Sequence, residues 1–348
     1  MRGSNKNSGR TGKTMRAFLR TIVAALLFAP VAAKAEPIKL KLAFFSSDRT
    51  HLYRSIVKPF VDAVNAEGRG RVEIDVYLSG KLGGDPQAQS RLVLDGTADI
   101  AYVVTPYEQQ RFPDTAVIDL PGVFEDAREA ILAFTHLVGN GTIRDFKDFF
   151  VIGAVASQPE SIHLRPAVST LADLKGKRIR ANNDTEIAAM KGLGMVPVFV
   201  PLTQTASAIS SGNLDGAFAP PVPMVEFGIG RVAANHYMLG TSSVPLALLM
   251  SRKRFESLPP DVQALIRKNS GESLAQQAIQ IDQTSTDLIM NQLESDPKRK
   301  VIMPSPPDMK IANDVFESVV ADFTAADPYH AKLVNALRME TAKLRTEN

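Results

Sequence analysis

The length, charge and composition of the chain exclude several classes of protein. Its 348 residues include 40 Lys and Arg, 37 Asp and Glu, and no Cys, so disulfides and thiolate chemistry are excluded. Seven of the basic residues and no acidic residue lie in residues 1–35, which leaves 33 basic against 37 acidic residues, a net charge of about −4, from residue 36 onward. This acidic remainder predicts no basic face for nucleic acid.

The N-terminal residues have the pattern of an export signal. Arg16 and Arg20 supply positive charge, residues 21–31 are apolar, and a small-x-small cleavage site ends at Ala35. The apolar run is shorter than the roughly 20 residues of a spanning helix. This favours a signal peptide cleaved after Ala35, and a periplasmic protein, over an uncleaved membrane anchor. The start codon, Met1 or Met15, stays open, and the polar stretch between the two favours the second.

Strands and helices are predicted to alternate along the first half of the exported chain. In order, the sequence predicts strand 38–44, helix 51–66, strand 71–78, helix 87–95, strand 98–103, two helical stretches after residue 124, and strand 149–156. Alternation of this kind is typical of a parallel sheet covered by helices on both faces.

A strand–helix–strand–helix unit follows in residues 171–216. The first strand ends in Arg180, and then come helix 185–191, strand 196–200 and helix 204–211, closed by Gly212. Arg180 is thereby placed at the carboxyl end of a strand, where ligands bind in open α/β sheets. Its planar, permanently charged guanidinium matches a carboxylate.

The last part of the chain predicts strand 246–251, a long helix over Val262–Leu293, a short strand within 298–303 and C-terminal helices. About 310 exported residues exceed a comfortable single core of roughly 250, which predicts two lobes. No low-complexity linker separates them, so strands that cross between the lobes are expected to join them.

Five short motifs follow one another along the chain. They are SGKLGG at 79–84, DGTADI at 95–100, DLKG at 173–176 leading into Arg180, GLGMVP at 192–197, and LDG at 214–216. Together they resemble the solute receptors of tripartite ATP-independent periplasmic (TRAP) transporters, of the dicarboxylate-receptor type. The resemblance implies an α/β, two-lobed periplasmic binding protein, each lobe a mostly parallel sheet flanked by helices, with one long helix spanning both lobes. The expected lobes are residues 36–157 plus 246–285, and residues 158–245 plus 286–348.

The same resemblance implies what the molecule does. A TRAP receptor is expected to bind a small organic acid by hinge closure and to deliver it to a large and a small membrane subunit. It is expected to be a monomer without cofactor, metal or catalytic residues, and not an enzyme.

The resemblance also implies ligand-binding positions. Arg180 is expected to clamp the ligand carboxylate, and Asn183 either contacts ligand or merely caps a helix. Val104, Leu202 and Ala219 are apolar where receptors for polyhydroxylated acids carry polar partners or pocket contacts. Such walls favour a monocarboxylate with an apolar or aromatic body.

Four further residues are candidates to contact that body. Ser47, Tyr102 and Thr105 are expected to close over it from the first lobe, and Phe218 is either a stacking partner or ordinary core.

Three alternatives remain open. One is a receptor for an ATP-driven importer, another is a receptor that serves a sensor, and the third is a periplasmic enzyme acting on an organic acid. An enzyme needs a nucleophile–base pair or metal ligands. The five histidines are scattered without metal-ligand spacing, and the dinucleotide-like pattern at 228–233 follows no strand, which disfavours the third alternative.

Overall fold

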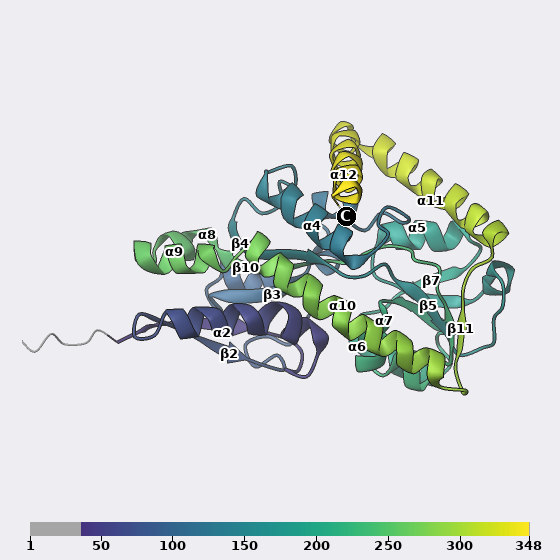
Figure 1. The fold of residues 1–348 in the computed structure, drawn as a ribbon, viewed down its shortest axis with the longest axis horizontal. Coiled ribbons are helices and arrows are strands. Elements are labelled where there is room, and N and C mark those ends of the chain that lie inside the picture. Colours follow the sequence, from purple (N-terminus) through teal and green to yellow (C-terminus); the bar gives the residue numbers. More distant parts are fainter. Residues whose placement is uncertain (1–35, 348) are drawn as a thin grey trace, which may run out of the picture. The chain divides into compact units, whose positions relative to one another are not determined.

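The computed structural model of the chain describes residues 36–347, and the predicted signal peptide lies outside them. The described residues form two β-sheets flanked by helices (Figure 1), which confirms the predicted α/β class. Within this part of the chain, none of the helices has the length and apolarity needed to cross a bilayer.

The first sheet has the strand order β2-β1-β3-β10-β4. Its strands are β1 (Ile38–Ala43), β2 (Val72–Tyr77), β3 (Ile100–Val104), β4 (Phe149–Ala156) and β10 (Pro245–Ser251). The helices and helical turns that follow its strands are η1 (Tyr53–Val57), α2 (Lys58–Glu67), α3 (Gln89–Leu94), η2 (Thr105–Glu108), η3 (Asp114–Val117) and α4 (Ala127–Gly139). One α-helix, α4, stands where two helical stretches were predicted, because residues 140–148 form turns.

The second sheet has the strand order β11-β9-β5-β8-β6-β7. Its strands are β5 (Ser161–Leu164), β6 (Arg178–Ala181), β7 (Val196–Phe199), β8 (Gly216–Ala219), β9 (Asn235–Tyr237) and β11 (Lys300–Ile302). Its helical elements are η4 (Leu171–Leu174), α5 (Asp184–Gly192), α6 (Leu202–Ser210), α7 (Pro221–Glu226) and η5 (Ile229–Arg231).

Both sheets are mostly parallel, as the sequence predicted, and each contains one strand that runs against the others. β1 runs parallel to β2 and β3, and β6 runs parallel to β7 and β8. β10 is antiparallel to β3 and β4, and β5 is antiparallel to β8 and β9. These two strands follow crossings between the sheets, where no helix reverses the chain as it does in a βαβ unit.

The helix predicted over Val262–Leu293 is two helices. After α8 (Arg252–Glu256), α9 (Pro260–Lys268) ends at Asn269, and α10 (Glu272–Ser295) begins after Gly271. Gly271 has φ 60° and ψ −126°, a conformation that only glycine adopts readily. Its N–H donates to the carbonyl of Ile152 at 2.8 Å, which ties the break to β4.

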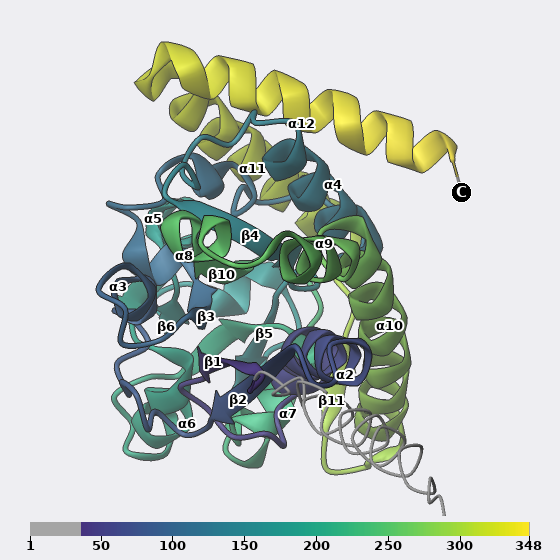
Figure 2. The ribbon, with the colours of Figure 1, turned by 90° about the vertical axis from the view of Figure 1, so that its left-hand side faces the viewer.

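The helix α10 packs against elements of both sheets, as the predicted long helix was expected to do. It contacts α4 and β4 at the first sheet and α7 and β11 at the second, and Figures 1 and 2 show it running along one side of both. The two C-terminal helices divide between the sheets: α11 (Pro306–Ala326) packs on α5, and α12 (Pro328–Thr346) packs on α4. The contacts of α12 thus differ from the expected lobe boundary, which placed residues 286–348 together.

Two chain segments cross between the sheets and pair with each other. The N–H of Ser157 donates to the carbonyl of Val244 at 3.0 Å, and the N–H of Glu160 donates to the carbonyl of Ser242 at 2.8 Å. In return, the N–H of Thr241 donates to the carbonyl of Glu160 at 2.8 Å. The second sheet is therefore joined to the first by a paired connection that lies beside the cavity described next.

Candidate functional site

Arg180 lies at the carboxyl end of β6, where the sequence predicted it, and its side chain is buried at 1% exposure. Two backbone carbonyls orient the guanidinium. Its Nε donates to the carbonyl of Val200 at 2.9 Å, and its Nη1 donates to the carbonyl of Phe218 at 2.8 Å. Because both acceptors are main-chain atoms at the ends of neighbouring strands, the backbone of the sheet fixes the position of the Arg180 guanidinium.

Three side chains complete the surroundings of Arg180. Its Nη2 donates to the Tyr107 hydroxyl at 3.2 Å and to Oδ1 of Asn182, and its Nη1 lies 3.6 Å from Oε1 of Glu160. The Tyr107 hydroxyl also accepts from the N–H of Leu202 at 3.1 Å. Tyr107 belongs to η2 beside the first sheet, so this hydroxyl connects the two sheets at the site.

The guanidinium lines a cavity of about 530 Å³, a volume that includes the part open to solvent. The other walls are mostly apolar and come from both halves of the chain, among them Phe45, Val104, Leu202 and Leu246. One buried charge among apolar walls is the usual composition of a small-molecule site.

The cavity contains some of the residues that the sequence singled out. Arg180, Val104 and Leu202 line it together. Their contact with a ligand stays a prediction.

The other candidates from the second half do not line the cavity. Asn183 caps α5, because its Oδ1 accepts from the N–H of Glu186 at 2.9 Å and its Nδ2 donates to Asp119 at 2.9 Å. Phe218 and Ala219 are fully buried in the core of the second sheet. Both act through their carbonyls: that of Phe218 accepts from Arg180, and that of Ala219 from a histidine of β5.

The other candidates from the first half, Tyr102, Thr105 and Ser47, also lie outside the cavity walls. Tyr102 is fully buried against Phe44, with ring centroids 5.3 Å apart. The hydroxyl of Thr105 donates to the carbonyl of Pro245 at 3.3 Å, and Ser47 accepts from the backbone of its own loop. Ordinary packing and turn formation account for these positions.

Sequence reasoning missed Tyr107, Asn182 and Glu160. Asn182 stands between the two positions that were considered, Arg180 and Asn183. Tyr107 and Glu160 have no local signal, because their proximity to Arg180 arises from segments 73 and 20 residues away.

A cluster of buried carboxyl groups lies behind the guanidinium. The Nδ2 of Asn182 donates to Glu160 at 3.1 Å and to Glu186 at 2.9 Å. Burial, reinforced by the negative charge of Glu186, raises the pKa of Glu160 well above its ordinary value, and the same two causes raise the pKa of Asp119. The higher the pKa of Glu160, the less its carboxyl group competes with a ligand carboxylate for the charge of Arg180, 3.6 Å away.

We expect Glu160→Gln to flatten the pH dependence of stability. Because the pKa of Glu160 is raised in the folded state, the folded protein binds this proton more tightly than the unfolded chain does. The contribution of Glu160 to the free energy of unfolding therefore declines as pH rises above about 4.5, the ordinary carboxyl pKa. Glutamine mimics the protonated acid and keeps an acceptor for Asn182. Urea unfolding between about pH 5 and pH 8 measures the slope. The matched control is Glu317→Gln, an exposed residue of α11. Equal slopes in wild type and Glu160→Gln would contradict the assignment.

The described part of the chain has no group of three or more His, Cys, Asp or Glu side chains placed to hold a metal ion. His163 and His236 instead contact each other, with Nδ1 atoms 2.9 Å apart, in the core of the second sheet. Burial is the main reason that the pKa of His163 is lowered to about 3, so the pair is neutral.

Comparison with known proteins gives a consistent picture. Residues 43–327 match the family model of the bacterial extracellular solute-binding proteins, family 7. The C4-dicarboxylate-binding periplasmic protein DctP of Rhodobacter capsulatus is 25% identical over 252 residues, 70% of this chain and 74% of that protein.

Solved structures of similar fold are TRAP solute-binding proteins. One, from a marine metagenome, is specific for aromatic acid ligands and is in complex with metahydroxyphenylacetate; it is 26% identical with a TM-score of 0.83, over 88% of this chain and 99% of that chain. Another, from Rhodoferax ferrireducens T118, contains copurified benzoate and is 24% identical with a TM-score of 0.79, over 88% and 98% of the two chains.

Proposed function

Because this chain belongs to the bacterial extracellular solute-binding proteins of family 7, it is a solute receptor of the TRAP type, and we propose that its ligand is a monocarboxylic acid with an apolar or aromatic body. The observation that carries the proposal is the buried guanidinium of Arg180 in a cavity with mostly apolar walls. A charged donor fork binds a carboxylate through paired hydrogen bonds. Apolar walls favour an apolar body because polar groups would lose water there without replacement.

The relationship to the marine metagenome receptor supports an aromatic body, since that protein is specific for aromatic acids at 26% identity. The walls of the cavity are compatible with a ring, because Phe45 from the first half and Leu202 from the second both line it.

The ligand carboxylate takes the Nη2 side of Arg180. Val200 and Phe218 hold the other donors through main-chain carbonyls, whereas the partners of Nη2 among the described residues are side chains, those of Tyr107 and Asn182. The Tyr107 hydroxyl accepts two hydrogen bonds. Its own proton is free to be donated to the incoming carboxylate.

Binding is coupled to hinge closure. The two lobes, one built on each sheet and with α12 packed on the first, meet at the paired crossing segments, which can bend while each sheet stays rigid. A ligand that contacts Arg180 on one lobe and Val104 on the other shifts the population toward the closed form.

The family match supports the proposed setting of this receptor, and the pattern of residues 16–35 supports its export. The chain is exported with cleavage after Ala35, acts as a monomer, and delivers the acid to the large and small membrane subunits of a TRAP transporter. It does not act on nucleic acid and does not transform its ligand.

A thermal-shift screen against organic acids tests the proposal. A ligand at 100 times its dissociation constant stabilises the fold by about 2.7 kcal/mol. We expect apolar and aromatic monocarboxylates to raise the melting temperature more than uronic or sialic acids, because Val104 and Leu202 offer no polar partners for their hydroxyls. A uronic acid that binds more tightly than every apolar monocarboxylate would overturn the proposal.

A further inference from the structure

A second cavity adjoins the one that contains Arg180. Its volume is about 420 Å³, including the part open to solvent, and residues from both halves of the chain line it. The two cavities share five wall residues, Leu52, Ser157, Pro220, Pro223 and Leu246. Because four of the five are apolar, the boundary between the two cavities is mostly apolar, as the middle of one ligand that reaches both would require.

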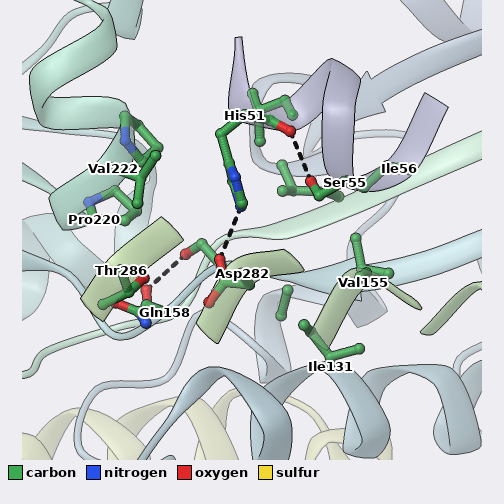
Figure 3. Close-up of a pocket in the computed structure, with 16 residues that line it drawn as sticks. His51, Ser55, Ile56, Ile131, Val155, Gln158, Pro220, Val222, Asp282 and Thr286 are labelled. Carbon is green, nitrogen blue, oxygen red and sulfur yellow. Dashed lines mark hydrogen bonds and ion pairs between the residues drawn. The ribbon is translucent and has the colours of Figure 1, made fainter. Parts of the chain in front are cut away.

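The far end of this second cavity is polar. His51, at the start of the helix that continues into η1 and α2, points toward Asp282 of α10, with its Nε2 3.0 Å from Oδ1 of the carboxylate (Figure 3). Thr286 lies one helical turn after Asp282 and lines the same cavity. We call His51, Asp282 and Thr286 the polar end.

The backbone of His51 is held from two sides. Its N–H donates to Oε2 of Glu226 in α7 at 2.6 Å, and its carbonyl accepts from the Ser55 hydroxyl at 2.8 Å. His51 is 4% exposed. The imidazole is therefore fixed in orientation, as expected for a recognition residue rather than a mobile surface side chain.

Each member of the polar end has a buried atom without a hydrogen-bond partner in the described part of the chain. These atoms are Nδ1 of His51, Oδ2 of Asp282 and Oγ1 of Thr286. Buried polar atoms are nearly always paired in native proteins. Three such atoms on one cavity therefore indicate that a polar group of a ligand completes them.

The hydrogen-bonding capacity of the three atoms indicates which polar group of a ligand can bind there. The Asp282 carboxylate only accepts: its Oδ1 faces the His51 ring, and its Oδ2 has no partner among the described residues. The Thr286 hydroxyl both donates and accepts. An acceptor-rich end binds a hydrogen-bond donor such as a hydroxyl or an amine, and it repels a second carboxylate.

We propose that the polar end is a second subsite of the ligand site, which binds a hydroxyl or amino group carried by the same acid whose carboxylate Arg180 holds. This inference rests on the proposed function and narrows it: the ligand is an acid with an apolar middle and a donor at the end remote from the carboxylate.

The test compares acids that differ by one hydroxyl. Isothermal titration calorimetry measures the affinities of wild type for phenylacetate and for its 3-hydroxy and 4-hydroxy derivatives. We expect one hydroxy acid to bind about 10- to 100-fold more tightly than phenylacetate, since a hydrogen bond to a charged group is of that order. Thr286→Val should reduce this ratio about tenfold.

The same helix provides a matched control. Thr284→Val makes the identical substitution on the exposed face of α10, where the hydroxyl donates only to the carbonyl of Gln280. It should leave the ratio at the wild-type value. Thr286→Val should also keep or raise the unliganded melting temperature, because the valine removes a buried hydroxyl without a partner.

The outcomes separate this inference from the proposed function. If phenylacetate binds and Arg180→Ala abolishes its binding, the proposed function stands. A hydroxy acid no tighter than phenylacetate, or a ratio unchanged in Thr286→Val, then overturns the subsite. If none of the three acids binds, the subsite is also overturned, and the screen of organic acids decides whether the proposed function falls with it.

Discussion

Arg180→Ala is expected to lower the affinity for the acid by roughly thirtyfold to several thousandfold. The substitution removes a charge-assisted pair from a buried site, and truncating one partner of such a pair costs about 2–5 kcal/mol. Arg180→Lys should recover little of this loss, because a point charge cannot reproduce the planar fork that contacts Val200, Phe218 and Tyr107. Calorimetry with an acid found in the screen measures both variants.

The same strand offers the control for this experiment. Arg178 lies two residues earlier on β6, but it is exposed and contacts Asp215 and the carbonyl of Gly212. Arg178→Ala should bind the acid as tightly as wild type. Circular dichroism should show that Arg180→Ala is folded, with a lower melting temperature because two buried carbonyls lose their donor. Near-native affinity in folded Arg180→Ala would refute the carboxylate clamp.

Gly216→Ala is expected to lower the free energy of unfolding by about 2–4 kcal/mol, the range of severe packing defects. Gly216 begins β8, between β5 and β6, and a Cβ there would come within 2.4 Å of the carbonyl oxygen of His163. A backbone atom cannot yield as a flexible side chain can, so the sheet must open. Urea denaturation measures the loss. Ligand affinity should fall as well, since β8 contains the Phe218 carbonyl that holds Arg180.

Gly139→Ala provides the comparison. Gly139 ends α4, is exposed, and an added Cβ would meet no atom within 4 Å. Alanine there should be neutral or slightly stabilising, because it has the higher helix propensity. An equal loss of stability in both variants, or none in Gly216→Ala, would show that contact with the His163 carbonyl does not limit this position.

The predicted helices and strands mostly appear at their predicted places. Residues 38–43 and 149–156 form strands, and β6 ends just after Arg180. These predictions rested on short-range periodicity, which the pleat of a strand and the turn of a helix impose directly. The break at Gly271 was missed because its cause is a conformation and a hydrogen bond to Ile152 that no local pattern reveals.

The candidate site was predictable only in part. Arg180, Val104 and Leu202 lie together on one cavity, whereas Asn183 is a helix cap and Tyr102 is core. Reasoning from strand ends finds the edge of the sheet where a ligand binds, but it does not say which way each side chain at that edge points. Side-chain direction depends on packing against elements from elsewhere in the chain.

The sequence by itself determined the α/β class, the family and the arginine at the carboxyl end of a strand, because these depend on composition, periodicity and the order of short motifs. Only the tertiary structure decided what surrounds that arginine and what lies beyond it. Tyr107 reaches Arg180 across 73 residues of sequence, and His51 reaches Asp282 across 231. Such contacts follow from strand order, from two crossings between the sheets, and from α10 packing along both. They arise because segments far apart in the sequence pack against each other and bury these side chains together. No local sequence pattern of either partner predicts such packing.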